Sequence, residues 1–298
     1  MRFFIKKEIM RITLLLLLVV SNLAAQKTPE IFQPGLISNG GVFGFTLSPD
    51  GKEAFWVQSN GGRDTLIIMH SMNVKGKWQQ PTPASFSGNA GVWKDIDPVF
   101  SPDGKTILFQ SNRPVEGKPD RTFFDIWISK REKNGWSKAI HLGNVINTDA
   151  SESFASMTKS GNIYFMKDNP DGKGSSDIWV SKFENNQYKD AVNLGAPVNT
   201  TFRESNPFVS PNEDYIIYFS SDSTGLGDVD LFISFKHGDQ WSKPKSLGSP
   251  INGKLGEFCP FYHERQKKLY FCRTVTHANG RRTEDIFVVD FDPAIFRN

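Results

Sequence analysis

The 298-residue chain is long enough to bury a large core, and its 38% hydrophobic and 22% charged residues are typical of a folded protein. This composition excludes wholesale disorder, because a disordered chain has too little apolar surface to offset the entropy lost on ordering. The 25 Phe and 7 Trp residues favour β structure, since aromatic side chains suit half-buried pleated surfaces.

The first 25 residues follow the plan of a secretory signal peptide. Basic residues precede the apolar run 12–20, and Ala24 and Ala25 supply small side chains before Gln26. The apolar run is too short to span a membrane comfortably. We therefore expect residues 1–25 to be removed and the mature protein, residues 26–298, to be exported to the periplasm or the cell exterior without a membrane span. An uncleaved N-terminal anchor is the alternative.

Loss of the signal peptide changes the charge of the chain. The net charge of +3 reflects 35 basic and 32 acidic residues, and residues 1–25 hold four of the basic and one of the acidic residues. The mature chain therefore has 31 of each. Nucleic-acid binding needs a cationic surface, so the sequence argues against a nucleic-acid partner.

A turn signature recurs along the chain. Residues 48–52 read SPDGK, and the same five residues return at 101–105, a repeat of about 53 residues. Weaker copies lie at 158–161 and 210–213. Asp-Gly between two apolar runs predicts a tight hairpin, because Gly tolerates a positive φ.

Further strand-like segments follow each turn. The second segments are apolar and lie at 107–109, 163–165, 217–219 and 269–271. The third begin with Asp, an aliphatic residue and an aromatic residue, at 125–129, 177–181, 230–234 and 285–288. The fourth run over 136–147, 188–199 and 241–252. Four short strands per repeat without helical periodicity predict one blade of a β-propeller.

Five sets of strands can be counted, and they begin near Val42, Asp95, Glu152, Glu204 and Glu257. The fifth set ends near Asp290 after three strands, and Phe32–Asn39 resembles the missing fourth strand. We therefore predict a single all-β domain, a five-bladed β-propeller of four-stranded blades that the N-terminal strand closes in the last blade. Closure removes exposed sheet edges, whereas the alternative, an open stack of sheets, leaves two.

The SPDGK turn, the following I-L-F or I-Y-F run and the DIW strand resemble the TolB-type, WD-repeat-like propeller family over residues 31–290. That family includes periplasmic scaffold proteins, peptidase-associated propellers and envelope proteins with a peptidoglycan-binding domain. The resemblance implies the fold and a place in the cell envelope. It does not imply an activity, because one fold serves many functions.

The loops between second and third strands are long and varied, at 111–124, 167–176, 221–229 and 273–284. In a propeller these loops share one face, here called the long-loop face, with the links between blades. Long loops on a rigid scaffold are where binding sites usually lie. We expect a protein or glycan partner on this face, with tolerated insertions as the alternative.

Alignment of the repeats places four acids at the start of the innermost strands, here called the ring acids: Asp95, Glu152, Glu204 and Glu257. They are candidates for ligand binding and for catalysis, since glycoside hydrolases use two carboxylates with separated pKa values. The alternative is a structural role in each blade. Repetition favours the structural role, because a blade-building residue should recur and a catalytic residue need not.

Three arginines in or beside the long loops are candidates for binding an anionic ligand: Arg113, Arg203 and Arg273. The alternative is that they pair with the ring acids, Arg203 with the adjacent Glu204.

Cys259 and Cys272 flank the last hairpin. If its two-residue loop is Arg265–Gln266, the two cysteines face each other and are candidates for a disulfide, which export permits. Two free thiols packed as small apolar side chains are the alternative.

No cofactor and no metal are predicted. The loops 168–172 and 222–230 are rich in Asp, Asn and Gly, so calcium is conceivable, but turn chemistry explains these residues equally well. The histidines lack metal-ligand spacing and no G-x-S-x-G elbow is present. The sequence favours a monomeric, non-enzymatic binding or scaffold module for a protein or glycan, with a carbohydrate-active hydrolase that uses the ring acids as the alternative.

Overall fold

The computed structural model describes residues 27–60, 62–88, 91–117, 122–168 and 174–297. The expected signal peptide lies outside these ranges. Among the residues that are described, no helix has the length and apolar character needed to cross a membrane.

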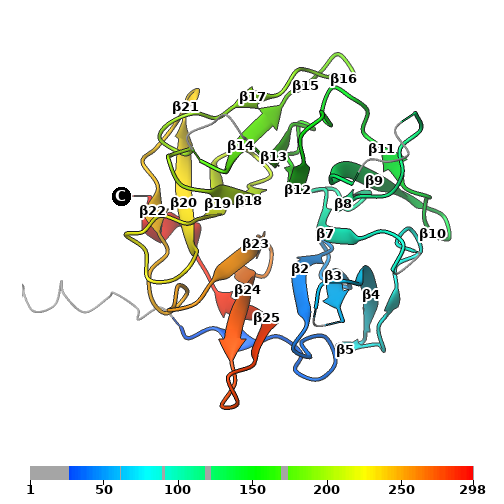
Figure 1. Cartoon of the computed structure of the whole chain (residues 1–298), viewed down its shortest axis with the longest axis vertical. Coiled ribbons are helices and arrows are strands. Elements are labelled where there is room, and N and C mark those ends of the chain that lie inside the picture. The colour runs from blue at the N-terminus through cyan, green and yellow to red at the C-terminus, as the bar shows by residue number, and fades with distance from the viewer. Residues whose placement is uncertain (1–26, 61, 89–90, 118–121, 169–173, 298) are drawn as a thin grey trace, which may run out of the picture.

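The chain forms a propeller of five sheets arranged around a central axis (Figure 1), which confirms the predicted fold class. One strand of each sheet lies closest to the axis. These innermost strands are β2 (Val42–Leu47), β7 (Asp95–Phe100), β12 (Glu152–Met157), β18 (Glu204–Val209) and β23 (Glu257–His263).

Two antiparallel partners complete the body of each blade. The second strands are β3 (Glu53–Ser59), β8 (Thr106–Ser111), β13 (Ile163–Asp168), β19 (Tyr215–Ser220) and β24 (Lys268–Thr276). The third strands are β4 (Leu66–Val74), β9 (Asp125–Glu132), β14 (Ser176–Ser181), β20 (Asp230–His237) and β25 (Arg282–Asp290). A 3₁₀ helix at Pro293–Phe296 follows the last strand.

The outer edge of each blade is shorter than the sequence predicted. It consists of two-residue pairings: β5 (Lys77–Trp78), β6 (Thr82–Pro83), β10 (Gly135–Trp136), β11 (Ile140–His141), β15 (Phe183–Glu184), β16 (Gln187–Tyr188), β17 (Val192–Asn193), β21 (Gln240–Trp241) and β22 (Lys245–Ser246). Side chains replace part of the missing ladder. Asn147, Asn199 and Asn252 each bond both the N–H and the C=O of one residue in the adjacent third strand, so the edge stays attached where regular pairing stops.

The N-terminal segment closes the ring in the last blade, as predicted. β1 (Glu30–Ile31) pairs antiparallel with β25, slightly earlier in the chain than expected. The Phe32 N–H then donates to the Ile286 carbonyl at 2.8 Å. The Ser38 hydroxyl also contacts the backbone of Ile286 at 3.3 Å, where blade 1 uses Ser87 and blades 2 to 4 use Asn.

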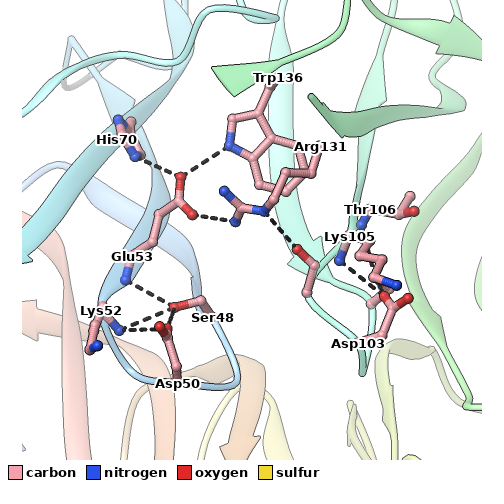
Figure 2. Close-up of polar contacts among 12 residues, drawn as sticks. Ser48, Asp50, Lys52, Glu53, His70, Asp103, Lys105, Thr106, Arg131 and Trp136 are labelled. Carbon is pink, nitrogen blue, oxygen red and sulfur yellow. Dashed lines mark hydrogen bonds and ion pairs between the residues drawn. The ribbon is translucent and has the colours of Figure 1, made fainter. Parts of the chain in front are cut away.

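The hydrophobic core lies between adjacent sheets. Blades 1 and 2 meet through a cluster that includes Phe55, Phe100 and Trp127. Beside this cluster, Glu53 contacts His70, Arg131 and the Trp136 indole N–H, so it links the two blades (Figure 2). These bonds outweigh the effect of burial and lower the pKa of Glu53 to about 2.

Candidate functional site

The ring acids begin the innermost strands at the long-loop end of the central channel. Asp95, Glu152, Glu204 and Glu257 are at most 1% exposed. None of the four lines the cavity at this end of the channel, although residues one or two positions later do.

Three ring acids cap the turn that precedes their own strand. Glu152 accepts the Thr148 N–H at 3.0 Å, Glu204 accepts the Thr200 N–H at 2.9 Å, and Glu257 accepts the Gly253 N–H at 2.9 Å. Burial raises the pKa of each of these carboxyls, and the hydrogen bonds oppose that rise. Such repeated backbone capping supports the structural interpretation of the ring acids.

Two of the three candidate arginines pair with ring acids. Arg113 Nη2 lies 2.6 Å from Asp95 Oδ1, and Arg273 Nε lies 2.8 Å from Glu257 Oε1. Arg203 differs, because the expected pair with Glu204 does not form. The Arg203 guanidinium instead lies over the ring of Phe219 and lines the cavity at the long-loop face.

A β-bulge interrupts every innermost strand after its second residue. The third residue of each strand has a positive φ, between 43° and 59°. These residues, here called the floor residues, are Gly44, Asp97, Phe154, Asn206 and Cys259. Bulges re-aim side chains, and such strained non-glycine conformations are concentrated at functional sites.

A cavity of about 420 Å³, here called the funnel, opens on the long-loop face. Asp97, Asn206 and Cys259 form its polar floor. Apolar side chains on its wall include Phe124, Met166, Phe219 and Phe258, and charged side chains include Arg63, Asp168, Arg203, Asp228 and Glu284. Its size and its mixture of apolar and polar groups suit a small-molecule ligand.

Asp97 is the buried carboxyl of the funnel floor and is 7% exposed. The Cys259 thiol lies 3.5 Å from Asp97 Oδ1 and 3.5 Å from Asn206 Oδ1, so its single proton can bond one of them at a time. Burial raises the pKa of Asp97 to about 7, although the thiol and the charge of Arg63 oppose the rise. Asp97 can therefore hold a proton close to neutral pH.

The carboxyl groups of the funnel wall lie in a different environment. Glu284 forms an ion pair with Arg63, so its charge is compensated. Partial burial raises the pKa of Asp168, and the nearby charge of Arg203 opposes this rise. The funnel thus presents a buried proton-holding carboxyl at its floor and a charge-compensated carboxylate on its wall.

The sequence contained a signal for the floor residues that alignment alone did not reveal. The first position of the innermost strands repeats an acid, whereas the third position holds a different residue in every blade. A residue with a specific role in ligand chemistry need not repeat. The bulge that turns the third residue has no signature in the sequence.

The disulfide prediction is wrong, because Cys259 and Cys272 are both free and buried. Cys272 lies opposite Phe258, not Cys259. The hairpin keeps the expected register up to Phe261, which lies opposite Tyr270, and the bulge at Cys259 then shifts it by one residue. The thiols pack in the core, as the alternative interpretation stated.

A second, smaller cavity of about 160 Å³ opens at the opposite end of the channel. It is here called the apolar cup, and each blade contributes to its lining: Leu47, Val99, Met157, Phe208 and Phe261. The cup lies beside the tight turns, so the long-loop face is not the only hollowed face of the propeller.

The loops considered for calcium show turn chemistry where they are described. Asp222 accepts from the N–H and hydroxyl of Thr224, and Asp230 accepts from the Leu226 N–H. Residues 169–172 lie outside the described ranges. Across the described part of the chain, no group of three His, Cys, Asp or Glu side chains is placed to hold a metal ion.

Comparison with known proteins supports the fold alone. No family model and no curated protein matches the chain. Among solved structures it is similar to a glycoside hydrolase, with a TM-score of 0.58 and 10% identity over 89% of this chain and 91% of that one. It is also similar to an α-L-arabinofuranosidase from Lactobacillus brevis, with a TM-score of 0.52 and 14% identity over 87% and 93% of the two chains.

A third similar structure is a GH43_12 protein retrieved from a capybara gut metagenome, with a TM-score of 0.57 and 15% identity. The match covers 90% of this chain but spans only 54% of that protein's length. At such identities the likeness establishes a shared propeller architecture.

Proposed function

We propose that the chain is a carbohydrate-active propeller that binds a sugar in the funnel and hydrolyses its glycosidic bond. The observation that carries the proposal is the placement of Asp97, a buried carboxyl on the funnel floor at a position that does not repeat between blades. The similarity to three propeller structures named for glycoside hydrolysis supports it as an analogy of fold.

The chemistry requires an acid and a base on either side of the bond that is cleaved. Asp97 would give its proton to the glycosidic oxygen as that oxygen leaves. A wall carboxylate, Asp168 or Glu284, would take a proton from the water that adds to the sugar carbon. One water is consumed and both carboxyl groups exchange their protonation states, which solvent then restores.

The funnel wall also provides contacts that sugars use. Phe124, Phe219 and Phe258 offer apolar surface for the faces of sugar rings, and Asn206 and the charged wall residues offer partners for hydroxyl groups. Burial of Asp97 next to this surface would keep water away from its proton.

The test is hydrolysis of a panel of polysaccharides and oligosaccharides by the wild-type protein and by Asp97→Asn. Glu204→Gln is the matched control, because it makes the same carboxyl-to-amide change at a ring acid outside the funnel. We expect Asp97→Asn to lose hydrolysis and Glu204→Gln to keep it. Equal loss in both variants, or turnover that survives Asp97→Asn, would reject the assignment.

A non-enzymatic glycan- or protein-binding module is the second candidate. The engagement of the ring acids with backbone groups favours it, because each of the four acids already accepts a backbone N–H. Sugar binding without turnover by the wild-type protein across the panel would favour this candidate over hydrolysis.

A further inference from the structure

Arg203 differs from the other cation that lines the funnel. Arg63 forms an ion pair with Glu284. Within the described ranges, Arg203 has no carboxylate at ion-pair distance, although Asp168 lies near enough to feel its charge. Arg113 and Arg273, the other two arginines considered for anion binding, each form an ion pair with a ring acid.

The backbone of Arg203 is held in place, and its guanidinium packs on an aromatic ring. Its backbone N–H donates to the Ser221 hydroxyl at 3.0 Å, and its carbonyl accepts the Ser221 N–H at 3.0 Å. The guanidinium carbon lies 5.1 Å from the centre of the buried Phe219 ring. A fixed backbone and a cation–π contact limit the freedom of the side chain. Within the described ranges its guanidinium donates no hydrogen bond.

The surrounding charges restrict which anion can bind there. Asp168, Asp228 and Glu284 also line the funnel, so a doubly charged group such as a phosphate ester would meet repulsion that one arginine does not offset. A single negative charge fits better. The planar guanidinium matches the two oxygens of a carboxylate, which it binds through two parallel hydrogen bonds.

We propose that the funnel accepts a sugar that carries a carboxylate, a uronic acid residue, and that Arg203 binds this carboxylate. The inference rests on the proposed function, because it assigns the substrate class of the same funnel. Arg203 thereby acts as a specificity-determining residue and takes no part in proton transfer.

Asp168 adds a pH dependence to this contact. Its position beside Arg203 places it near the bound carboxylate, and two negative charges there repel each other. Because burial already raises the pKa of Asp168, acidification neutralises it and removes the repulsion. We therefore expect uronic acid binding to strengthen as the pH falls, until the sugar carboxylate itself takes up a proton.

The test compares acidic oligosaccharides with the same oligosaccharides after chemical reduction of their carboxyl groups to alcohols. Binding is measured by calorimetry on the full chain for wild type, Arg203→Met, Arg203→Lys and the control Arg265→Met. The control removes one exposed positive charge beside the apolar cup. We expect wild type to prefer the acidic form about tenfold, as a charge-assisted hydrogen bond predicts.

Arg203→Met should abolish this preference by weakening only the acidic form, and Arg203→Lys should restore part of it. Arg265→Met should behave as wild type. Equal affinity of wild type for acidic and reduced sugars would overturn the inference and leave the proposed function standing. Stronger binding of sulfated sugars would overturn the carboxylate assignment, and absence of sugar binding across the whole panel would reject both proposals.

Discussion

The innermost strands line both ends of the central channel, five of them at the apolar cup and four at the funnel, yet the two ends differ in chemistry. At the apolar cup the strands contribute aliphatic and aromatic side chains in every blade. At the funnel the strands contribute Asp, Asn and Cys from bulged positions, and long loops add paired and unpaired charges. The apolar cup, where every blade contributes the same kind of residue, has a structural role. The funnel, where the residues differ between blades, has the features expected of a ligand site.

Because the two ends differ, substitutions at one end should change the stability of the fold, and substitutions at the other should change turnover. Residues at the hairpin end should govern how firmly the blades hold together. Residues at the funnel should govern turnover with little effect on folding. The four predictions below run from the largest expected effect to the smallest.

Substitutions at the two ends of the channel should have opposite consequences. Asp97→Asn should lower kcat by about 10²–10⁴-fold, the usual contribution of a general acid, without lowering the midpoint of thermal unfolding. Met157→Ala at the apolar cup should leave kcat unchanged and cost about 1–2 kcal/mol, since Met157 is only partly buried. Steady-state kinetics and thermal denaturation measure both; a cup variant that abolished turnover would remove the distinction between the ends.

Loss of the Glu53 contacts should destabilise the joint between blades 1 and 2 (Figure 2). Glu53→Gln leaves Arg131 without its ionised partner, and we expect the free energy of unfolding to fall by about 2–3 kcal/mol at pH 7. The pKa of Glu53 is lowered to about 2, so its stabilisation is present above the pKa of an unfolded Glu.

That stabilisation should disappear as the pH falls below about 4 towards 2, because the carboxyl is then protonated in both states. Urea denaturation of wild type and Glu53→Gln at pH 7 and pH 3 measures this change. A difference between the two proteins that stayed constant with pH would show that the charge of Glu53 is not responsible.

A comparison of Gly44→Ala with Gly76→Ala should distinguish the effect of backbone strain from the effect of moving Asp97. Gly44 has φ +59°, and a Cβ there would lie 2.6 Å from Asp97 Oδ1, whereas Gly76 has φ +84° and open space around it. Gly76→Ala should cost about 1–2 kcal/mol, the penalty for a left-handed alanine, and Gly44→Ala should cost more because its Cβ also collides with Asp97. Only Gly44→Ala should also reduce turnover, because Asp97 must shift; equal activity of both variants would show that the position of Asp97 is unimportant.

The rate of hydrolysis should depend on the protonation of Asp97. The pKa of this carboxyl is raised to about 7, so the acid form that donates the proton is lost as the pH rises through that value. We expect kcat/KM to fall about tenfold per pH unit above pH 8 and to level off on the acid side until the base is protonated. A profile that stayed flat from pH 6 to pH 9 would exclude Asp97 as the proton donor.

The repeated features of the fold were predictable from the sequence because the same motifs recur from blade to blade. The SPDGK turns, the DIW strands and the count of five sets were sufficient to place the sheets and the closing strand. The shortened outer edges were not predicted, because Asn147, Asn199 and Asn252 replace strand pairing with side-chain bonds.

The candidate site was predicted only as a face of the molecule. The ring acids drew attention because they repeat, but repetition reflects turn capping here. The position of Asp97 in the funnel could not be predicted from the sequence, because a local bulge determines which residue points to the channel. The same bulge displaced Cys259 from the position opposite Cys272.

The pairing of β1 with β25 means that the sheet of the last blade contains both early and late parts of the chain. The contact between Ser38 and Ile286 joins residues 248 positions apart. Bringing such distant segments together costs conformational entropy before any stabilising contact forms, and this cost slows folding. During synthesis the first four blades can assemble while Glu30–Ile31 waits unpaired, so the ring can close only after the ribosome has made the residues of β25.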